Sequence, residues 1–288
     1  MNKILFLKTY HNIFKILSLF LIVSCSKNDL PDFNKLETIR IIAFQVSAPE
    51  VNPGATVSVT PLISDITATS LNYTAQTCLD AGISVGAEPT CENNPTKQVI
   101  VAQTALTLPG SAENWTGLAN SFSVTVPSTA IIFAGKTAVE QYNGVSFIIE
   151  YFLTNNLGST TKSIKRIIVS DPAKVIKNSN PNLSQIYADG LIMTTLTLNS
   201  KISLSTDLSA ASAETYTTFL SDGTSVAKVE SLAVTWFITD GKTKYYRSEG
   251  LGSNEYTTAN EAPAGRSAYV IAVARDDRGG ISIVKKKF

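Results

Sequence analysis

The order of apolar and polar positions along the chain predicts β-strands almost throughout. Residues 56–60 and 232–238 alternate with a period of two, the pattern of a strand that buries one face. Residues 145–153 and 268–274 are nearly continuous apolar runs, typical of central core strands. Long helical periodicity is absent, and residues 208–220 are the best candidate for a short helix. Further strand-like runs cover residues 39–46, 71–75, 99–101, 122–126, 162–169, 191–198, 201–204 and 281–284.

Turn signals rich in glycine, asparagine and aspartate separate these runs. Many short strands between such turns predict β-sandwiches, and 288 residues are enough for two domains of ordinary size. We therefore expect an all-β fold with two tandem β-sandwich domains, at residues 36–172 and 180–288, with a linker around residues 179–182. Both expected domains close with a buried strand, a glycine-containing turn and a charged final strand, which indicates a weak internal repeat of one architecture.

The N-terminal segment has a different pattern. Three lysines and no acid precede an apolar run at residues 16–23. This run is shorter than the roughly 20 apolar residues that a transmembrane helix needs. A basic start and a short apolar core are instead typical of an export signal.

The run ends in Ile-Val-Ser followed by Cys25, which resembles the lipobox of bacterial lipoproteins. The resemblance implies that the signal peptide 1–24 is removed, that Cys25 carries palmitate or related acyl chains, and that residues 25–35 form a lipidated tether. Several acyl chains anchor firmly, since each buried methylene contributes about 0.8 kcal/mol. Ser26, in place of aspartate, implies a lipid anchor at the outer membrane, with the protein exposed to the periplasm or the cell surface. The alternative is an ordinary signal peptide with a coincidental cysteine.

Composition and charge exclude several classes of function. Lys3, Lys8 and Lys15 are three of the 24 basic residues and would leave with the signal, so 21 basic and 23 acidic residues remain, a net charge of −2. This balance gives no electrostatic footprint for nucleic acid. The single histidine, His11, also lies in the signal, which removes Ser-His-Asp and Cys-His catalysis and most zinc sites from the expected mature chain. We expect no catalytic residue, metal site or cofactor.

Two cysteines remain once Cys25 is assigned to the lipid. Cys78 and Cys91 form an even pair in an oxidising compartment, where such pairs are usually bridged. A closed loop of this size contributes roughly 3 kcal/mol in the chain-entropy model. A redox pair is the alternative, although the spacing is not Cys-x-x-Cys and no basic residue lies between the two to depress a thiol pKa.

Residues 36–54, 236–237 and 275–280 resemble bacterial cell-surface lipoproteins with tandem immunoglobulin-like domains. The resemblance implies that Trp236 occupies the place of the core tryptophan on the third strand of such sandwiches. The chain departs from the antibody pattern because its two remaining cysteines lie in one loop, so they cannot form the inter-sheet disulfide. No activity follows, since this fold serves adhesins, carbohydrate binders and spacers alike.

A few residues are candidates for ligand contacts. Asp276 and Asp277 lie beside two glycines, and Asp240 lies on a similar turn, so these carboxylates are a possible calcium site. A local ion network is the alternative, because Arg275 and Arg278 flank the aspartate pair.

The aromatic candidates are Trp115 in a polar, glycine-containing stretch and the adjacent Tyr245 and Tyr246, any of which is a possible contact for a sugar or a partner. Trp115 could equally fold back over a sheet edge. Adjacent strand residues face opposite ways, so we expect at most one of the two tyrosines on an outer face.

These observations favour a non-enzymatic, lipid-anchored envelope protein that acts as a binding or structural module in adhesion or envelope assembly. Its expected partners are the membrane, through the anchor, and an envelope protein or glycan, with no nucleic acid. The alternatives are a carbohydrate-binding surface lipoprotein and, third, a hydrolase that uses carboxylates alone.

Overall fold

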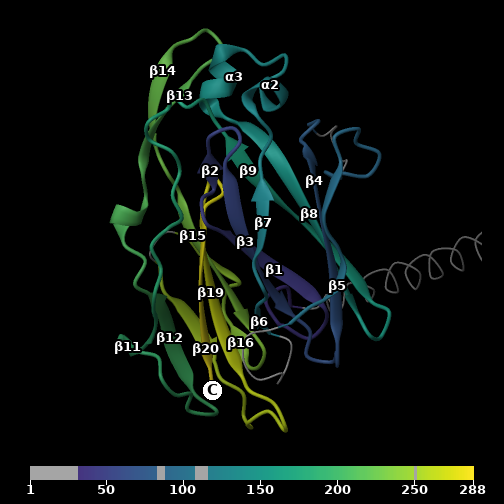
Figure 1. Ribbon diagram of the computed structural model, residues 1–288. Helices are drawn as coiled ribbons and strands as arrows, with labels where there is room; N and C mark the ends of the chain where they lie inside the picture. The colour runs from purple at the N-terminus through teal and green to yellow at the C-terminus, as the bar shows by residue number, and fades with distance from the viewer. Residues whose placement is uncertain (1–31, 83–87, 108–115, 250–251) are drawn as a thin grey trace, which may run out of the picture. The chain divides into compact units, whose positions relative to one another are not determined.

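The computed structural model describes residues 32–82, 88–107, 116–249 and 252–288 (Figure 1). The predicted signal peptide, Cys25 and Trp115 lie outside the described residues, so the roles proposed for them stay predictions. Within the described part of the chain, no helix is long and apolar enough to span a membrane.

The first sandwich consists of two facing sheets. One has the order β1-β3-β6, with β7 also pairing with β3, and contains β1 (Arg40–Val46), β3 (Thr56–Ser64), β6 (Gly117–Leu118) and β7 (Phe122–Thr125). The other has the order β2-β9-β8-β4-β5 and contains β2 (Glu50–Val51), β4 (Leu71–Leu79), β5 (Gln98–Ala105), β8 (Val145–Asn155) and β9 (Thr160–Val169). The short β2 runs parallel to β9, whereas the longer strands pair antiparallel.

Alternating side chains from both sheets fill the core of the first sandwich. β3 shows the predicted period of two, with Val57 and Val59 buried between exposed polar residues. Tyr151 lies at the centre, and its ring stacks on those of Tyr73 and Phe122 at centroid distances of 5.3 and 6.1 Å. Burial raises the pKa of Tyr151, so its hydroxyl stays protonated and the residue acts as a core aromatic.

The second sandwich also consists of two facing sheets. One has the order β11-β10-β12-β18-β16, from β10 (Ile186–Ala188), β11 (Leu191–Ile192), β12 (Lys201–Thr206), β16 (Lys242–Thr243) and β18 (Asn254–Thr257). The other has the order β17-β15-β19-β20, from β15 (Leu232–Ile238), β17 (Arg247–Glu249), β19 (Tyr269–Asp276) and β20 (Ile281–Lys287). A separate hairpin, β13 (Thr215–Phe219) and β14 (Ser225–Val229), is inserted before β15.

The two sandwiches share one strand order. In the first, β1-β3-β7 face β5-β4-β8-β9; in the second, β10-β12-β18 face β17-β15-β19-β20. Both orders are those of immunoglobulin-type sandwiches. The predicted all-β sandwich class is therefore confirmed, and Trp236 on β15 is fully buried, as predicted for the third main strand. The division into separate domains at 36–172 and 180–288 stays a prediction; by its internal contacts, Asn34–Phe288 is one compact unit.

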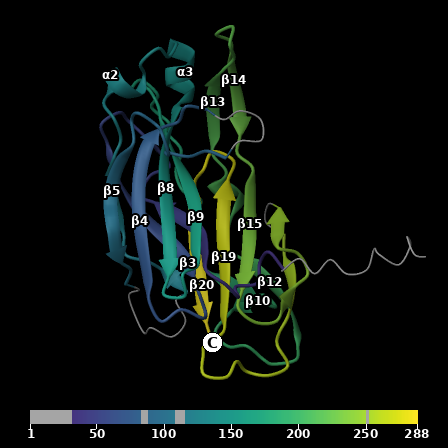
Figure 2. The ribbon, with the colours of Figure 1, turned by 90° about the vertical axis from the view of Figure 1, so that its right-hand side faces the viewer.

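The apolar run at residues 268–274 is explained by the position of β19, whose two faces pack against different apolar clusters. Figures 1 and 2 show where this strand lies. Alternate residues such as Val270 fill the core of the second sandwich. The residues between them, including Ile271 and Val273, pack against Ile42 of the first sandwich. Because both faces of this strand are buried, the period of two disappears from its sequence.

Parts of the expected tether and of the expected linker are packed against strands and do not form flexible connections. Asn34, in the predicted tether, accepts a hydrogen bond from the backbone N–H of Ile238 on β15 at 2.9 Å. In the predicted linker, Asn180 donates to the carbonyl of Val46 at 2.6 Å and accepts from the N–H of Ile281 at 2.9 Å. The linker therefore bonds to both sandwiches.

The helix expected at residues 208–220 is wrong. That region holds a single 3₁₀ turn, Ala210–Ser212, followed by β13, because its β-branched threonines pair across a hairpin with β14. Most of the run at residues 191–198 is also irregular, since only Leu191–Ile192 forms a strand.

Two short helices occur instead, α2 (Thr129–Ile132) and α3 (Ala138–Asn143). A reciprocal capping box of Thr137 and Glu140 starts α3, and this Thr-x-x-Glu spacing is a signal present in the sequence.

Candidate functional site

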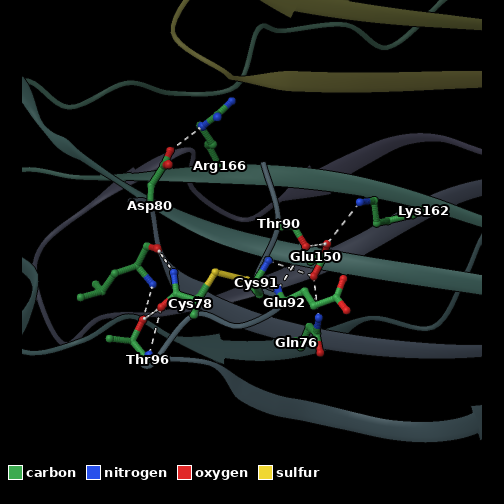
Figure 3. Close-up of a disulfide and its surroundings, with 12 residues drawn as sticks. Gln76, Cys78, Asp80, Thr90, Cys91, Glu92, Thr96, Glu150, Lys162 and Arg166 are labelled. Atoms are coloured by element: carbon green, nitrogen blue, oxygen red, sulfur yellow. Dashed lines mark hydrogen bonds and ion pairs between the residues drawn. A yellow bond between two sulfur atoms is a disulfide. The ribbon is translucent and has the colours of Figure 1, made fainter. Parts of the chain in front are cut away.

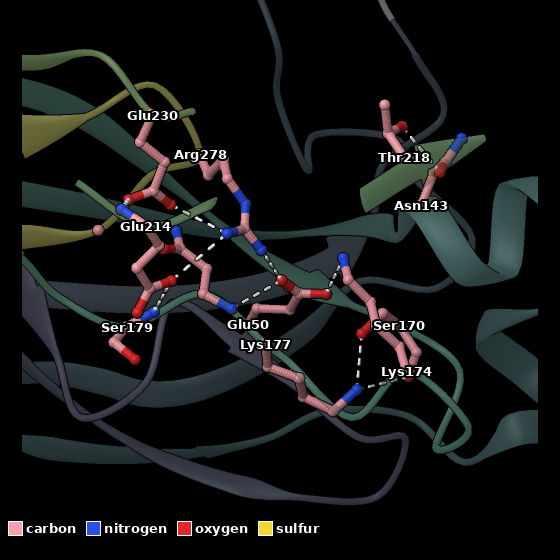
Figure 4. A network of polar contacts seen from close by, with 12 residues as sticks. Glu50, Asn143, Ser170, Lys174, Lys177, Ser179, Glu214, Thr218, Glu230 and Arg278 are labelled. Carbon is pink, nitrogen blue, oxygen red and sulfur yellow. Dashed lines mark hydrogen bonds and ion pairs between the residues drawn. The ribbon is translucent and has the colours of Figure 1, made fainter. Parts of the chain in front are cut away.

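The main polar cluster of the molecule lies where the first sandwich, the connecting segment and the β19–β20 turn meet (Figure 4). We call this group of side chains the junction cluster. Its members come from β2, from the segment after β9, from both ends of the β13–β14 hairpin and from the turn. They are Glu50, Lys174, Glu214, Glu230, Asp276 and Arg278.

The turn that presents Arg278 is shaped by Asp276. One carboxylate oxygen of Asp276 accepts hydrogen bonds from the backbone N–H groups of Arg278 and Gly280 at 2.8 and 2.7 Å. A Cβ atom at position 280 would lie 2.1 Å from the other oxygen of Asp276, so only glycine fits. The Asp-Asp-Arg-Gly-Gly sequence therefore forms a local hydrogen-bonded turn that directs the arginine away from its own strands.

The guanidinium of Arg278 reaches three carboxylates and one ring. It donates to Glu50 at 2.6 Å and to Glu230 at 2.9 Å, and a longer contact of 3.4 Å reaches Glu214. It also lies over the ring of Tyr216, 4.2 Å from the centroid. Arginine suits this position because its planar fork presents several donors at once and stacks on aromatic faces.

Glu50 ties the cluster to the first sandwich. Its side chain is 1% exposed and pairs with Lys174 at 2.6 Å as well as with Arg278. Its carboxylate also accepts from the backbone N–H of Asn178 at 2.9 Å. Burial acts to raise the pKa of Glu50, but the bonds from Lys174, Ser170 and Asn178 outweigh it, and the pKa lies below the ordinary value.

Glu230 has the opposite shift. Burial, with repulsion from Asp276 and Glu214, raises the pKa of Glu230 above its ordinary value despite the neighbouring Arg278. Lys165 of β9 contacts the β19–β20 turn, and burial lowers the pKa of its ammonium to about 8. Its ammonium donates to the carbonyl of Gly279. The cluster thus combines four carboxylates with two cations, and its ion pairs connect the two sandwiches.

A second polar site lies under the disulfide of the first sandwich (Figure 3). Cys78 and Cys91 are bonded, which confirms the predicted bridge, with their Cα atoms 5.5 Å apart. The bridge packs on Ile148, whose side chain points away from the core on β8. The bridge therefore covers the outer face of the β2-β9-β8-β4-β5 sheet at Ile148, which explains why an apolar residue stands there on the face opposite the core.

The same loop covers Glu150, which is fully buried. Its carboxylate accepts from the amide of Gln76 at 2.5 Å, from the hydroxyl of Thr90 at 2.9 Å and from the N–H of Cys91 at 3.2 Å, and Lys162 lies 3.6 Å away. Burial acts to raise the pKa of Glu150, but these donors lower it overall. Sequence patterns did not indicate this residue, because its partners come from three separate segments.

The structure does not bring the three calcium candidates together. Asp276 pairs with the first residue of β15, whereas Asp240 lies two positions beyond the last residue of that strand. Asp240 accepts a hydrogen bond from Arg266 at 2.8 Å, and Asp277 accepts from the N–H of Ser231 at 3.3 Å. No group of three or more Cys, Asp, Glu or His side chains in the described part of the chain is arranged to hold a metal ion.

Tyr245 and Tyr246 lie in the connection between β16 and β17 and not in a strand. The alternation rule that allowed only one of them on an outer face therefore does not apply. Their side chains are 55% and 58% exposed, so both are accessible for contact.

The sequence matches no protein-family model and no curated protein. Searches of solved structures find similarity to the periplasmic chaperone SfaE, with 9% identity over 85% of this chain and 98% of that one and a TM-score of 0.27. The chaperone YadV gives 11% identity over 86% and 100%, with a TM-score of 0.24. Red sea bream transglutaminase gives 8% identity and a TM-score of 0.25, and this chain spans 31% of its length. Scores of this size support no argument, so the fold assignment rests on the sheets described above.

Proposed function

We propose that this protein is a non-enzymatic module of a bacterial envelope, held at the outer membrane by acyl chains on Cys25, that binds a partner or supports an assembly. The observation that supports it best is the junction cluster. Its ion pairs join β2, the connecting segment and the β19–β20 turn in one buried network.

Such a joint favours a binding or structural role for a physical reason. Surfaces on two bodies bind one partner more tightly when their relative orientation is already fixed, because ordering them on association costs free energy. Buried polar networks whose members are hydrogen-bonded rigidify the segments that they join. The protein would bind its partner by burying a surface of complementary shape, and no covalent bond would form or break.

A second candidate function is carbohydrate binding. Tyr245 and Tyr246, both accessible, favour it, since exposed tyrosines are common anchors in binding surfaces.

Metabolic labelling tests the anchor. Cells that express the wild-type protein with radioactive palmitate should yield a labelled protein in the outer-membrane fraction, and the Cys25→Ala variant should carry no label. An unlabelled wild-type protein, or equal labelling of both, would contradict the proposal.

A further inference from the structure

A groove of about 340 Å³ lies on the outer face of the β11-β10-β12-β18-β16 sheet. Its floor contains Lys201 and Ser203 of β12 and Glu255 of β18, which the period of two places on the outer face, with Ser203 and Glu255 directly paired. Lys244 and Tyr245 form one wall. Its volume lies within the range of roughly 300–1,000 Å³ that is usual for small-molecule sites.

The exposed Tyr245 is fixed by a buried side chain. Asn254 is 2% exposed. Its amide oxygen accepts from the N–H of Tyr245 at 3.1 Å, and its amide nitrogen donates to the carbonyl of Tyr245 at 2.6 Å. The N–H of Lys244 donates to the carbonyl of Glu255 at 2.8 Å. The backbone at the aromatic residue is therefore held on both sides, and the Cα atom of Tyr245 has a fixed place at the wall of the groove.

The lining favours a hydroxyl-rich ligand over an apolar one. Sugar rings present C–H bonds on one face, which suits the electron-rich face of a tyrosine, and the surrounding groups can hydrogen-bond to hydroxyls. The lining charges are two ammonium groups and one carboxylate. Lys201 pairs with Glu255 at 3.4 Å. The ammonium of Lys244 lies over the Tyr245 ring, 5.3 Å from its centre, so an acidic ligand that stacks on this ring would replace that cation–π contact with an ion pair.

We propose that this groove binds an acidic saccharide, with a uronic acid ring stacked on Tyr245 and its carboxylate paired with Lys244. The inference deepens the proposed binding role and rests on it. It adds a ligand class and a site on the second sandwich. Palmitate labelling tests the lipid anchor and does not depend on this groove, so a failed labelling experiment can be distinguished from a failed saccharide titration.

Calorimetric titration of the mature chain with trigalacturonate tests the site, with maltotriose as a neutral sugar of equal length. Wild type should bind trigalacturonate, and Tyr245→Ala should weaken binding about tenfold or more. Tyr246→Ala is the matched control, because it removes an equally exposed tyrosine that does not line the groove, and it should change affinity less than about twofold. Lys244→Gln should abolish the preference for trigalacturonate over maltotriose.

Thermal unfolding of each variant checks that the fold is retained, which the exposure of both tyrosines leads us to expect. Three outcomes would overturn the proposal: no binding of trigalacturonate by wild type at millimolar concentration, equal losses in the two tyrosine variants, or equal affinity of wild type for the two sugars.

Discussion

Arg278 connects the β19–β20 turn of the second sandwich with Glu50 of the first, across 228 positions of sequence. The sequence indicated Asp276, Asp277 and the flanking arginines as either a calcium site or a local ion network. The turn does bond within itself, but its arginine pairs with distant acids. Spacing within a motif cannot identify such a partner, because strand pairing elsewhere in the fold determines which acidic residue lies next to the arginine.

Replacing Arg278 with alanine should lower the free energy of unfolding by about 3–5 kcal/mol, because Glu230 would stay buried without its cation and Glu50 would keep only Lys174. Urea denaturation at pH 7 measures this. Lys136→Ala is the control, since it removes an exposed pair with Glu140 and should cost less than about 1 kcal/mol. A loss for Arg278→Ala no larger than that of the control would contradict the account of the cluster.

The pKa of Glu50 makes a prediction with a defined sign. Because the folded-state pKa lies below the ordinary value of 4.5, its contribution is complete above pH 4.5 and is lost as pH falls through the folded pKa. Glu50→Gln should therefore be less stable than wild type at neutral pH, and its stability should decline less between pH 5 and pH 3.

Urea denaturation across that range gives the measurement. Glu230→Gln is an informative comparison, because the pKa of Glu230 is shifted in the opposite direction. The stability that this raised pKa contributes is present below pH 4.5 and is lost as pH rises through the folded pKa. If the free energy of unfolding fell equally between pH 5 and pH 3 for wild type and Glu50→Gln, the Glu50 carboxylate would not stabilise the fold in the way proposed.

At the scale of elements, the strands with one buried face were the most predictable. β3 and the core face of β15 follow their alternation, and the runs of β8 and β19 were correctly expected to be central. What covers the second face of each could not be predicted. For β8 it is the disulfide loop, and for β19 it is the first sandwich. The strand β13 was not predicted. The alanine and serine residues before it favoured a helix, but pairing with β14 in a hairpin determines the structure of this segment.

The disulfide loop should unfold separately once its bridge is removed. A Cys78→Ala, Cys91→Ala double variant should lose about 3 kcal/mol, the value expected for a closed loop of this length. The amide of Cys91 should also exchange faster with solvent, because its bond to Glu150 depends on the loop. Hydrogen exchange and thermal unfolding test both effects, and unchanged protection at Cys91 would argue against a loop held by the bridge.

At the scale of the whole molecule, contacts of several kinds join the two sandwiches, and three of them stand out among the described residues. They are the apolar layer around β19, the junction cluster, and a contact at α3, where the amide of Asn143 donates to the carbonyl of Phe219 on β13 at 2.7 Å and accepts from its N–H at 2.8 Å. The sequence predicted a linker where the structure has a packed segment, since polar composition alone does not distinguish the two. The central claim is that these contacts hold both sandwiches in one orientation.

Electron paramagnetic resonance distances between nitroxide labels on the two sandwiches test this claim most directly. Leu157→Cys and Leu191→Cys place the labels at exposed positions, 64% and 76% accessible, in a chain that also carries Cys25→Ala. We expect one narrow distance distribution for this chain and a broad one after Arg278→Met. A broad distribution without Arg278→Met would contradict the central claim, and a narrow one that Arg278→Met leaves unchanged would contradict the role assigned to Arg278.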